Sequence, residues 1–478
     1  MPQQITRRTF LAAAAAAGAA TYIPAVPALA AADYRRLVVG RRTIEVLGKS
    51  ASVYGVTGPG GASGLIFEPG ERFSVALENT LDEETTVHWH GQTPVPELDG
   101  IAETGYVAPL AAGEIRNFDF PTRPGTHWMH SHHGMQEQSL LTGPLIVRDA
   151  ADAAADAQEV TLLLNDFSFR DPAEILAGLT GGAGMDHGAM AGMDHGSMDS
   201  AAPMDHSMMG GMDLNDVEYD AFLANDRTLE DPQVIRAERN GRVRLRIING
   251  AAATAFWIDL DGHQATVLAV DGNPVAPLSG SRFPLAQAQR LDLLLDVPAG
   301  AVVPVFARRE GDVARTGIIL ASPGAAVSKL APVSEQAEVP VDLSLEERLV
   351  ATKPLSAHPV DTTLMAMLGG AMSPYVWTLD DRTWEERNKL EVKSGQRVAL
   401  GFMNHSMMAH PIHLHGHHFQ VTQINNRRIA GAVRDTVLVP PMATVVVEFD
   451  ADNPGRWLYH CHNLYHMMTG MMSELIYV

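Results

Sequence analysis

The sequence is poor in cysteine, with one residue, Cys461, among 478. A single cysteine excludes a disulfide within the chain, so the thiol must have another use. Basic residues are also scarce: 35 Lys and Arg stand against 56 Asp and Glu, and the formal net charge is -21. This charge disfavours binding to nucleic acid or to an anionic membrane and attracts cations. Cationic or neutral substrates therefore suit the chain better than anionic ones.

The apolar stretch near the N-terminus is too short to span a membrane, and two prolines interrupt it. It follows Arg7 and Arg8 and ends in Ala28-Leu29-Ala30, whose two alanines fit a small-residue cleavage site. This combination is typical of a twin-arginine export signal. We therefore expect residues 1–32 to be a signal peptide rather than a membrane anchor. The twin-arginine machinery would export the chain, and the mature protein would be periplasmic.

Long amphipathic helical patterns are missing, whereas short stretches of alternating polar and apolar residues, such as "RFSVALEN" and "TVVVEFD", are frequent. This alternation, punctuated by Gly and Pro, predicts an all-β fold of sandwich type. In three places a glycine opens such a stretch and an asparagine ends it, at Asn79, Asn249 and Asn404. The spacing of about 150 to 170 residues suits consecutive β-sandwich domains. We predict domains at 33–150, 151–322 and 341–478, with a linker at 323–340.

A Met/His-rich tract occupies residues 181–213 of the middle domain. It is rich in Gly, is poor in aromatic and branched residues, and reads as a loop outside the core. Met-Asp-His occurs three times in it. Thioether and imidazole suit copper, so the tract is a candidate for accessory copper capture, although a plain solvated linker is the alternative. The candidate ligands are Met185, His187, Met193, His195, Met204 and His206.

Four His-x-His pairs carry the main functional signal. They are His88 and His90, His130 and His132, His413 and His415, and His460 and His462. Residues two apart on a strand point to the same face, so each pair can present two imidazoles to one place. Four such pairs predict a site for several metal ions, and alternation by chance is a remote alternative.

The only cysteine lies between the histidines of the last pair, so its side chain should face away from theirs. Thiolate with imidazole and a weak thioether is typical of a blue-copper centre, and His410, His466 and Met471 can supply the missing ligands. A zinc hydrolase is a poorer fit, because a catalytic zinc needs about three protein ligands and has no redox use for the thiolate. A copper nitrite reductase would need fewer histidines.

The segments "HWHG", "HWMHSHHG", "HPIHLHGHHF" and "HCHNLYHMMTGM" resemble the four copper-binding motifs of three-domain multicopper oxidases. The export signal, the Met-rich tract and "YDAFLANDRTL" resemble the periplasmic copper-resistance members. The resemblance implies three consecutive cupredoxin-like Greek-key β-sandwich domains and four copper ions. The implied ligands are His410, Cys461, His466 and Met471 for type 1 copper, His88 and His413 for type 2, and His90, His130, His132, His415, His460 and His462 for type 3. Cys461 would also carry electrons from the type 1 copper to the cluster.

Two acids are candidates for supporting roles. Asp99 stands where the family has a proton relay for O2 reduction, and a turn residue before Gly100 is the less favoured alternative. Asp435 matches a family acid near the edge of the type 1 site, where it could attract a cationic donor, and capping a turn is its alternative role. Met467 stands where some relatives have a second acid, so the sequence leaves the second proton route open.

The resemblance implies oxidation of substrate by single electrons and reduction of O2 to water. Cu(I), oxidised in copper tolerance, is the expected substrate. A laccase acting on phenols and a copper-sequestering protein that uses the Met/His tract are the alternatives. All four motifs occur in one chain, so a monomer can complete the cluster.

Overall fold

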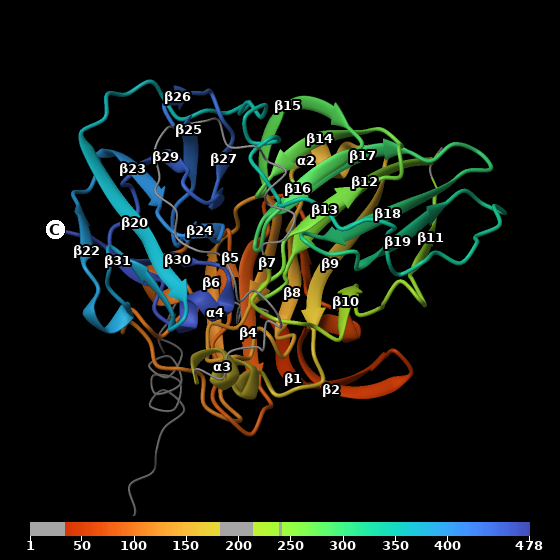
Figure 1. Cartoon of the computed structure of the whole chain (residues 1–478), viewed down its shortest axis with the longest axis horizontal. Coiled ribbons are helices and arrows are strands. Elements are labelled where there is room, and N and C mark those ends of the chain that lie inside the picture. Colours follow the sequence, from red (N-terminus) through yellow and green to blue (C-terminus); the bar gives the residue numbers. More distant parts are fainter. Residues whose placement is uncertain (1–33, 182–213, 239–240) are drawn as a thin grey trace, which may run out of the picture. The chain divides into compact units, whose positions relative to one another are not determined.

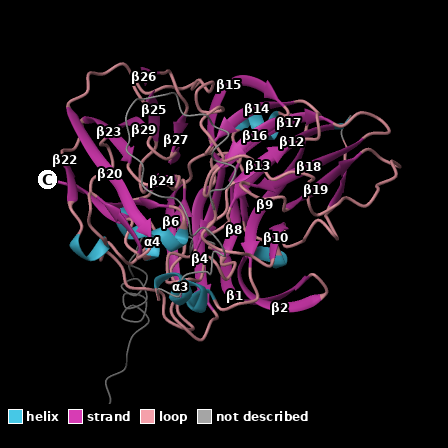
Figure 2. Cartoon of the chain, viewed as in Figure 1, coloured by secondary structure: helices cyan, strands magenta, loops and turns pink. Residues whose placement is uncertain are grey.

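A computed structural model of the chain describes residues 34–181, 214–238 and 241–478. The predicted signal peptide and the six candidate ligands of the Met/His-rich tract lie outside these ranges. Strands predominate in the described residues and the helices are short, as Figure 2 shows, so the all-β prediction is confirmed. None of the described helices has both the length and the apolar character that crossing a bilayer requires.

The strands form three successive pairs of sheets (Figure 1). The first pair has the strand orders β2-β1-β4-β6 and β3-β8-β7-β5. Its elements are β1 (Arg35–Val46), β2 (Lys49–Thr57), the 3-10 helix η1 (Pro59–Gly61), β3 (Leu65–Phe67), β4 (Arg72–Asn79), β5 (His88–His90), the 3-10 helix η2 (Pro96–Leu98), β6 (Ile115–Pro121), β7 (Gly125–His130) and β8 (Thr142–Val147).

The second pair has the orders β10-β9-β12-β17-β14-β15 and β11-β19-β18-β13-β16. Its elements are α2 (Ala150–Ala154), β9 (Gln158–Phe167), α3 (Pro172–Thr180), β10 (Ala221–Ala224), β11 (Val234–Arg236), β12 (Arg242–Asn249), β13 (Phe256–Asp259), β14 (Ala265–Val270), β15 (Asn273–Gly280), β16 (Arg282–Leu285), β17 (Arg290–Asp296), β18 (Val302–Arg309) and β19 (Arg315–Ala321).

The third pair has the orders β21-β20-β23-β29-β25-β26, with β27 also on β25, and β22-β31-β30-β24-β28. Its elements are β20 (Thr362–Met372), β21 (Tyr375–Leu379), the 3-10 helix η5 (Trp384–Glu386), β22 (Lys389–Val392), β23 (Arg397–Asn404), β24 (His410–Leu414), β25 (Phe419–Ile424), β26 (Arg427–Arg428), β27 (Val433–Arg434), β28 (Thr436–Val439), β29 (Thr444–Asp450), β30 (Arg456–Cys461), α4 (Leu464–Met468) and β31 (Met472–Tyr477).

The asparagine repeat marks equivalent strands in the three pairs of sheets. β4, β12 and β23 each pair with a parallel strand on one side and an antiparallel strand on the other. The amide of each terminal asparagine donates to backbone carbonyls across the sandwich, for example Asn404 Nδ2 to Val439 O at 2.9 Å. Its Oδ1 accepts from the backbone N–H two residues later, at 2.8 to 3.1 Å. The asparagine therefore ends the strand and fixes the turn that follows, which explains why it recurs.

Each pair of sheets encloses its own apolar core, and alternation along the strands decides which residues enter it. In β29, Val445, Val447 and Phe449 are fully buried while the residues between them are partly exposed. The three-sandwich fold is confirmed by these cores. The residue boundaries that we assign to the domains stay predictions.

Candidate metal centres

Short strands of the first and third sandwiches present the four histidine pairs. His88 on β5 lies opposite His130 at the end of β7. His413 on β24 lies opposite His460 on β30 in the same manner. Since side chains two apart share a face of a strand, each two-stranded ribbon directs its imidazoles to one side.

The eight paired histidines converge into three groups, two of which share His90. All eight are buried, and within a group the nitrogens lie within 4.8 Å of one another. In one group Nε2 of His460 lies 3.0 Å from Nε2 of His415 and 3.3 Å from Nε2 of His132. The groups are His90, His130 and His462; His132, His415 and His460; and His88, His90 and His413.

The unpartnered nitrogens in these groups fit metal ligation. Within the described residues, Nε2 of His88, His130, His413 and His462 and Nδ1 of His90 are buried without a hydrogen-bond partner. An unpaired buried polar atom is costly, whereas coordination to a metal satisfies it. Burial, with smaller contributions from neighbouring histidines, lowers the pKa of His130 and His413 well below the usual value. These two imidazoles are therefore neutral, which is the form that binds copper.

A fourth group contains the cysteine. Cys461 Sγ lies 3.6 Å from His410 Nδ1 and 3.7 Å from His466 Nδ1, and the two nitrogens are 3.1 Å apart. Met471 is fully buried in the same core, and its carbonyl accepts from the Cys461 N–H at 3.0 Å. The short helix α4 positions His466, because the side chain of Asn463 caps its first turn. One thiolate and two imidazoles at these distances fit a mononuclear copper site.

Cys461 joins this group to the histidine groups. Its thiol faces His410 and His466, while His460 and His462, its neighbours in the chain, belong to the two groups that lie behind it. Only one peptide bond therefore separates a ligand of the mononuclear site from a ligand of the cluster on either side. Burial raises the pKa of the Cys461 thiol, so metal binding must displace its proton.

Asp99 contacts two of the paired histidines. Its Oδ2 lies 2.9 Å from Nδ1 of His415, and its Oδ1 lies 3.4 Å from Nδ1 of His88. Nδ1 of His88 is also 3.1 Å from the Asp99 carbonyl oxygen. The carboxylate is almost fully buried, so it can orient both rings.

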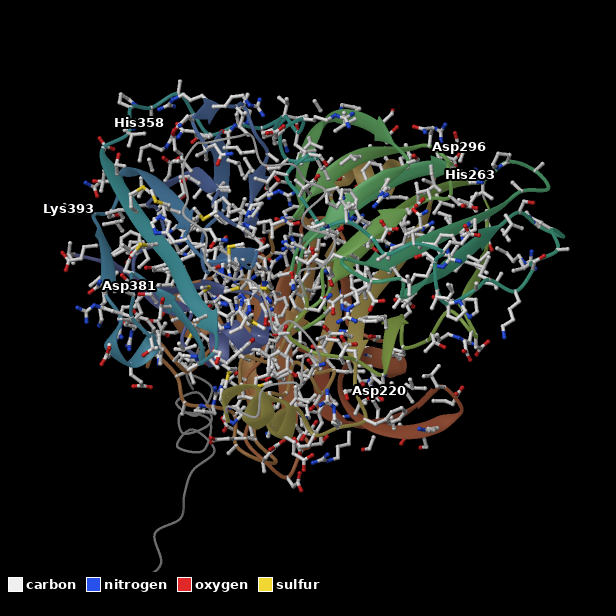
Figure 3. All side chains as sticks on the ribbon, in the orientation of Figure 1. Asp220, His263, Asp296, His358, Asp381 and Lys393 are labelled. Carbon is white, nitrogen blue, oxygen red and sulfur yellow. The ribbon has the colours of Figure 1, made fainter. Side chains whose placement is uncertain are left out.

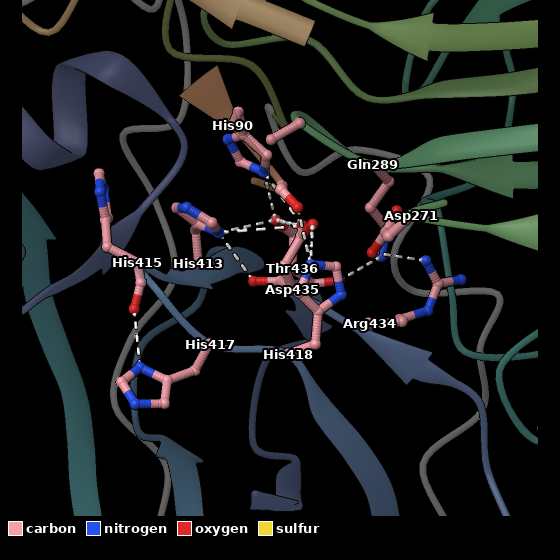
Figure 4. A network of polar contacts seen from close by, with 12 residues as sticks. His90, Asp271, Gln289, His413, His415, His417, His418, Arg434, Asp435 and Thr436 are labelled. Carbon is pink, nitrogen blue, oxygen red and sulfur yellow. Dashed lines mark hydrogen bonds and ion pairs between the residues drawn. The ribbon is translucent and has the colours of Figure 1, made fainter. Parts of the chain in front are cut away.

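Asp435 differs from the expectation of an acid at the edge of the mononuclear site. It is fully buried beside the histidine cluster (Figure 4), and its Oδ1 lies 3.1 Å from Nε2 of His90. Burial alone would raise its pKa, but the Arg290 guanidinium outweighs burial and holds the pKa far below the usual range. A carboxylate that is buried and neutralised in this way is not placed to attract cations from solution, and it fixes His90 instead.

Three further acids touch the histidines and were not found from the sequence. Glu137 Oε2 lies 2.7 Å from His130 Nδ1, Glu103 Oε1 lies 3.0 Å from His132 Nδ1, and Asp216 Oδ2 lies 3.0 Å from His466 Nε2. Glu137 and Asp216 are buried, whereas Glu103 borders a cavity of about 440 Å³ that also reaches His132. No spacing rule marks these acids, although Asp216 lies three residues after the Met/His-rich tract.

Comparison with known proteins agrees with this geometry. Models of multicopper oxidase domains match residues 38–152, 186–308 and 357–478. The sequence is 32% identical to the multicopper oxidase MmcO of Mycobacterium tuberculosis, over 90% of this chain and 83% of that protein. It is 24% identical to a copper resistance protein A homolog of Pseudomonas syringae pv. tomato, over 99% of each chain. It is 25% identical to Laccase-1 of Fomitopsis schrenkii, over 82% of this chain and 76% of that protein.

Among solved structures, the fold is similar to that of Fet3p, a multicopper oxidase that functions in iron import. The TM-score is 0.73 at 18% identity, over 92% of this chain and 90% of that one. A multi-copper oxidase from Pseudomonas thermotolerans is similar with a TM-score of 0.68 at 25% identity, over 93% and 98% of the two chains.

Proposed function

Because the chain belongs to the multicopper oxidase family, we propose that it removes single electrons from a reducing substrate at the Cys461 site and reduces O2 to water at the histidine cluster. The position of Cys461 between the two centres carries this proposal. The assigned ligands are His410, Cys461, His466 and Met471 for type 1 copper, His88 and His413 for type 2, and His90, His130, His132, His415, His460 and His462 for type 3. When bound, four coppers would supply the one-electron redox chemistry and store the four electrons that O2 requires.

Residues of this chain perform the tasks around that chemistry. The Cys461 side chain and the adjoining backbone give electrons a short covalent path to His460 and His462. Asp99 holds the rings of His88 and His415 and stores a proton beside them. Glu103, which is 24% exposed, contacts His132 from the cavity side and connects the cluster with solvent. Burial of the cluster excludes bulk water, which limits side reactions during O2 reduction.

We propose Cu(I) as the substrate. The described residues that flank the Met/His-rich tract adjoin the mononuclear site. On one side, Ile175 of α3 packs in the core that contains Trp377, whose ring lies 4.1 Å from that of His466. On the other side, Asp216 touches His466. The described segments on both sides of the tract thus lie near the site where electrons would enter, and the acidic chain attracts a cation.

We further propose that the enzyme acts in the periplasm and contributes to copper tolerance. Oxidation would convert Cu(I) to the less permeant Cu(II). The pair Arg7 and Arg8 supports export by the twin-arginine route, and similarity to copper resistance protein A over the full length supports the physiological role. All assigned ligands come from one chain, so a monomer suffices.

Oxidation of phenols, as in the laccase relatives, is the second candidate. The two are separated by measuring O2 uptake by the copper-loaded mature protein after anaerobic addition of Cu(I) or of a phenol. About four coppers per chain, a blue thiolate absorption band and fast uptake with Cu(I) are expected. Uptake with phenols alone would establish a laccase, and a fully loaded protein without the blue band would refute the assignment of Cys461.

Copper sequestration is tested by two changes. Deletion of residues 184–212 should reduce Cu(I) turnover but leave O2 reduction with other donors intact. Cys461→Ser should abolish copper tolerance if turnover is what protects the cell. Tolerance that survives Cys461→Ser and is lost on the deletion would instead assign the protective role to metal capture by the tract.

A further inference from the structure

Methionines gather on the outer face of a sheet in the third sandwich, away from the assigned copper ligands. Along β20, Ala366 and Leu368 are fully buried in the core, so Met365 and Met367 between them face outward. Met365 is 45% exposed. On β23 the alternation places Met403 on the same outer face, with Phe402 buried beneath. Packing in the core therefore does not account for these side chains.

The register of the strands brings the three methionines together. Met367 lies directly beside Met403, and Met365 lies beside Gly401 in the same parallel ladder. Figure 1 shows β20, β23 and β29 next to one another in the blue part of the chain. Figure 3 shows His358, Asp381 and Lys393 projecting from this same part, so its outer side reaches the protein surface.

Gly401 gives the Met365 thioether room to cross onto β23. A Cβ built at Gly401 would lie 2.4 Å from Met365 Sδ and 2.8 Å from its Cε. The backbone φ of Gly401 is not positive, so its conformation does not require glycine. Glycine also weakens the interior of a strand, so its benefit at this position is the space that the missing side chain leaves. Gly401 and Met403 share a face about 7 Å apart at the usual strand rise. Rotation of flexible Met side chains can therefore bring the sulfurs to about 4 Å, the separation of two sulfurs that share a metal ion.

We propose that Met365, Met367 and Met403 form a surface binding site for a soft monovalent cation, Cu(I) or Ag(I). Three neutral thioethers favour such ions over hard divalent cations, which require oxygen ligands. The Met367 N–H donates to Oδ1 of the neighbouring Asp380 at 2.8 Å, which fixes this carboxylate against the backbone of β20. The site does not depend on the oxidase activity proposed above.

The site is connected along the chain to the mononuclear centre. β23 ends at Asn404, and the segment that follows leads to His410. Ser406 in this segment has its Oγ 2.7 Å from Nε2 of His410. A cation on the methionine site is thus held at the start of a short connection to a ligand of the mononuclear centre.

Silver binding tests the site without any redox step. The copper-loaded full chain is titrated with Ag(I) against a competing chelator, and the Met365→Leu, Met367→Leu and Met403→Leu triple variant is titrated in parallel. Leucine has nearly the volume of methionine, so the fold should persist. We expect the triple variant to bind one Ag(I) fewer, while Met372→Leu, a change at an exposed methionine that ends β20, retains the full number. Equal stoichiometry in the triple variant and the unaltered chain overturns the proposal.

A second variant tests the geometry while keeping every sulfur. Gly401→Ala inserts a methyl group where the Met365 thioether now lies, and we expect Ag(I) affinity at this site to fall about 10-fold to 100-fold. Unchanged affinity in Gly401→Ala contradicts the shared site. The rate of O2 uptake is measured on the same samples, so a failure of the proposed oxidase function is recognised separately from a failure of silver binding.

Discussion

Arg290 and Asp435 form an ion pair that is fully buried, with Nη1 of Arg290 2.7 Å from Oδ1 of Asp435. Arg290 lies on β17 of the middle sandwich, which contributes no histidine pair, whereas Asp435 precedes β28 of the third. The same Oδ1 lies 3.1 Å from Nε2 of His90, a residue of the first sandwich. All three sandwiches therefore meet at one carboxylate, and the middle one supports the cluster without supplying a ligand.

Asp435→Asn should destabilise the protein strongly. The substitution leaves the buried Arg290 charge with only its longer, 3.7 Å pair to Asp271, and breaking a buried pair costs about 3–5 kcal/mol. Urea unfolding of the copper-loaded protein measures the change in free energy. Asp296→Asn is the matched control, because its pair with Arg242 is exposed and should contribute little. Equal effects of the two substitutions would contradict the structural role of Asp435.

Asp99→Asn should slow O2 reduction while copper content and the blue band persist. The amide retains a hydrogen-bonding oxygen near His415 but cannot supply a proton, and loss of a general acid costs about 10²-fold to 10⁴-fold in rate. Stopped-flow reoxidation of the fully reduced enzyme isolates this step. Glu97→Gln, an exposed acid two residues earlier, should leave the rate unchanged. Loss of copper in Asp99→Asn would instead indicate a purely structural residue.

Asp216→Asn should raise the reduction potential of the mononuclear centre. The carboxylate lies 3.0 Å from Nε2 of His466, and a nearby negative charge stabilises the oxidised metal more than the reduced one. Burial opposes the charge of Asp216, yet His466 and Asn463 hold its pKa below the usual value, so the charge is present at neutral pH. Redox titration of the blue band measures the shift. Glu218→Gln, at an exposed acid two residues on, should not move the potential.

Local periodicity made much of this arrangement predictable. The pairs such as His88 and His90 follow from the two-residue period of a strand, and the same rule placed Cys461 opposite its neighbours. The asparagine that ends β4, β12 and β23 repeats because each copy makes the same bonds to the following turn.

The acids around the cluster were not predictable in this way. Glu137 reaches His462 as well as His130, and these histidines lie on different sandwiches. Asp435 was expected near the mononuclear site, but Arg290, 145 residues earlier, fixes it beside His90 instead. Partners so distant in the chain leave no periodic signal, and a short motif specifies only its own strand.

Glu310 should make stability depend on pH near neutrality. Burial raises its pKa from 4.5 to about 7, although the Val341 N–H and Arg309 favour the charged form. The folded protein then binds a proton more tightly than the unfolded chain, so the stabilisation present at pH 4 is lost progressively as pH rises through about 7. Glu310→Gln removes this dependence. The free energy of unfolding of the variant, relative to that of the unaltered chain, should therefore be higher at pH 8 than at pH 5. Urea unfolding at both pH values, with exposed Glu335→Gln as control, measures the difference. A difference that is the same at both pH values would show that the Glu310 carboxyl does not titrate differently in the folded and unfolded states.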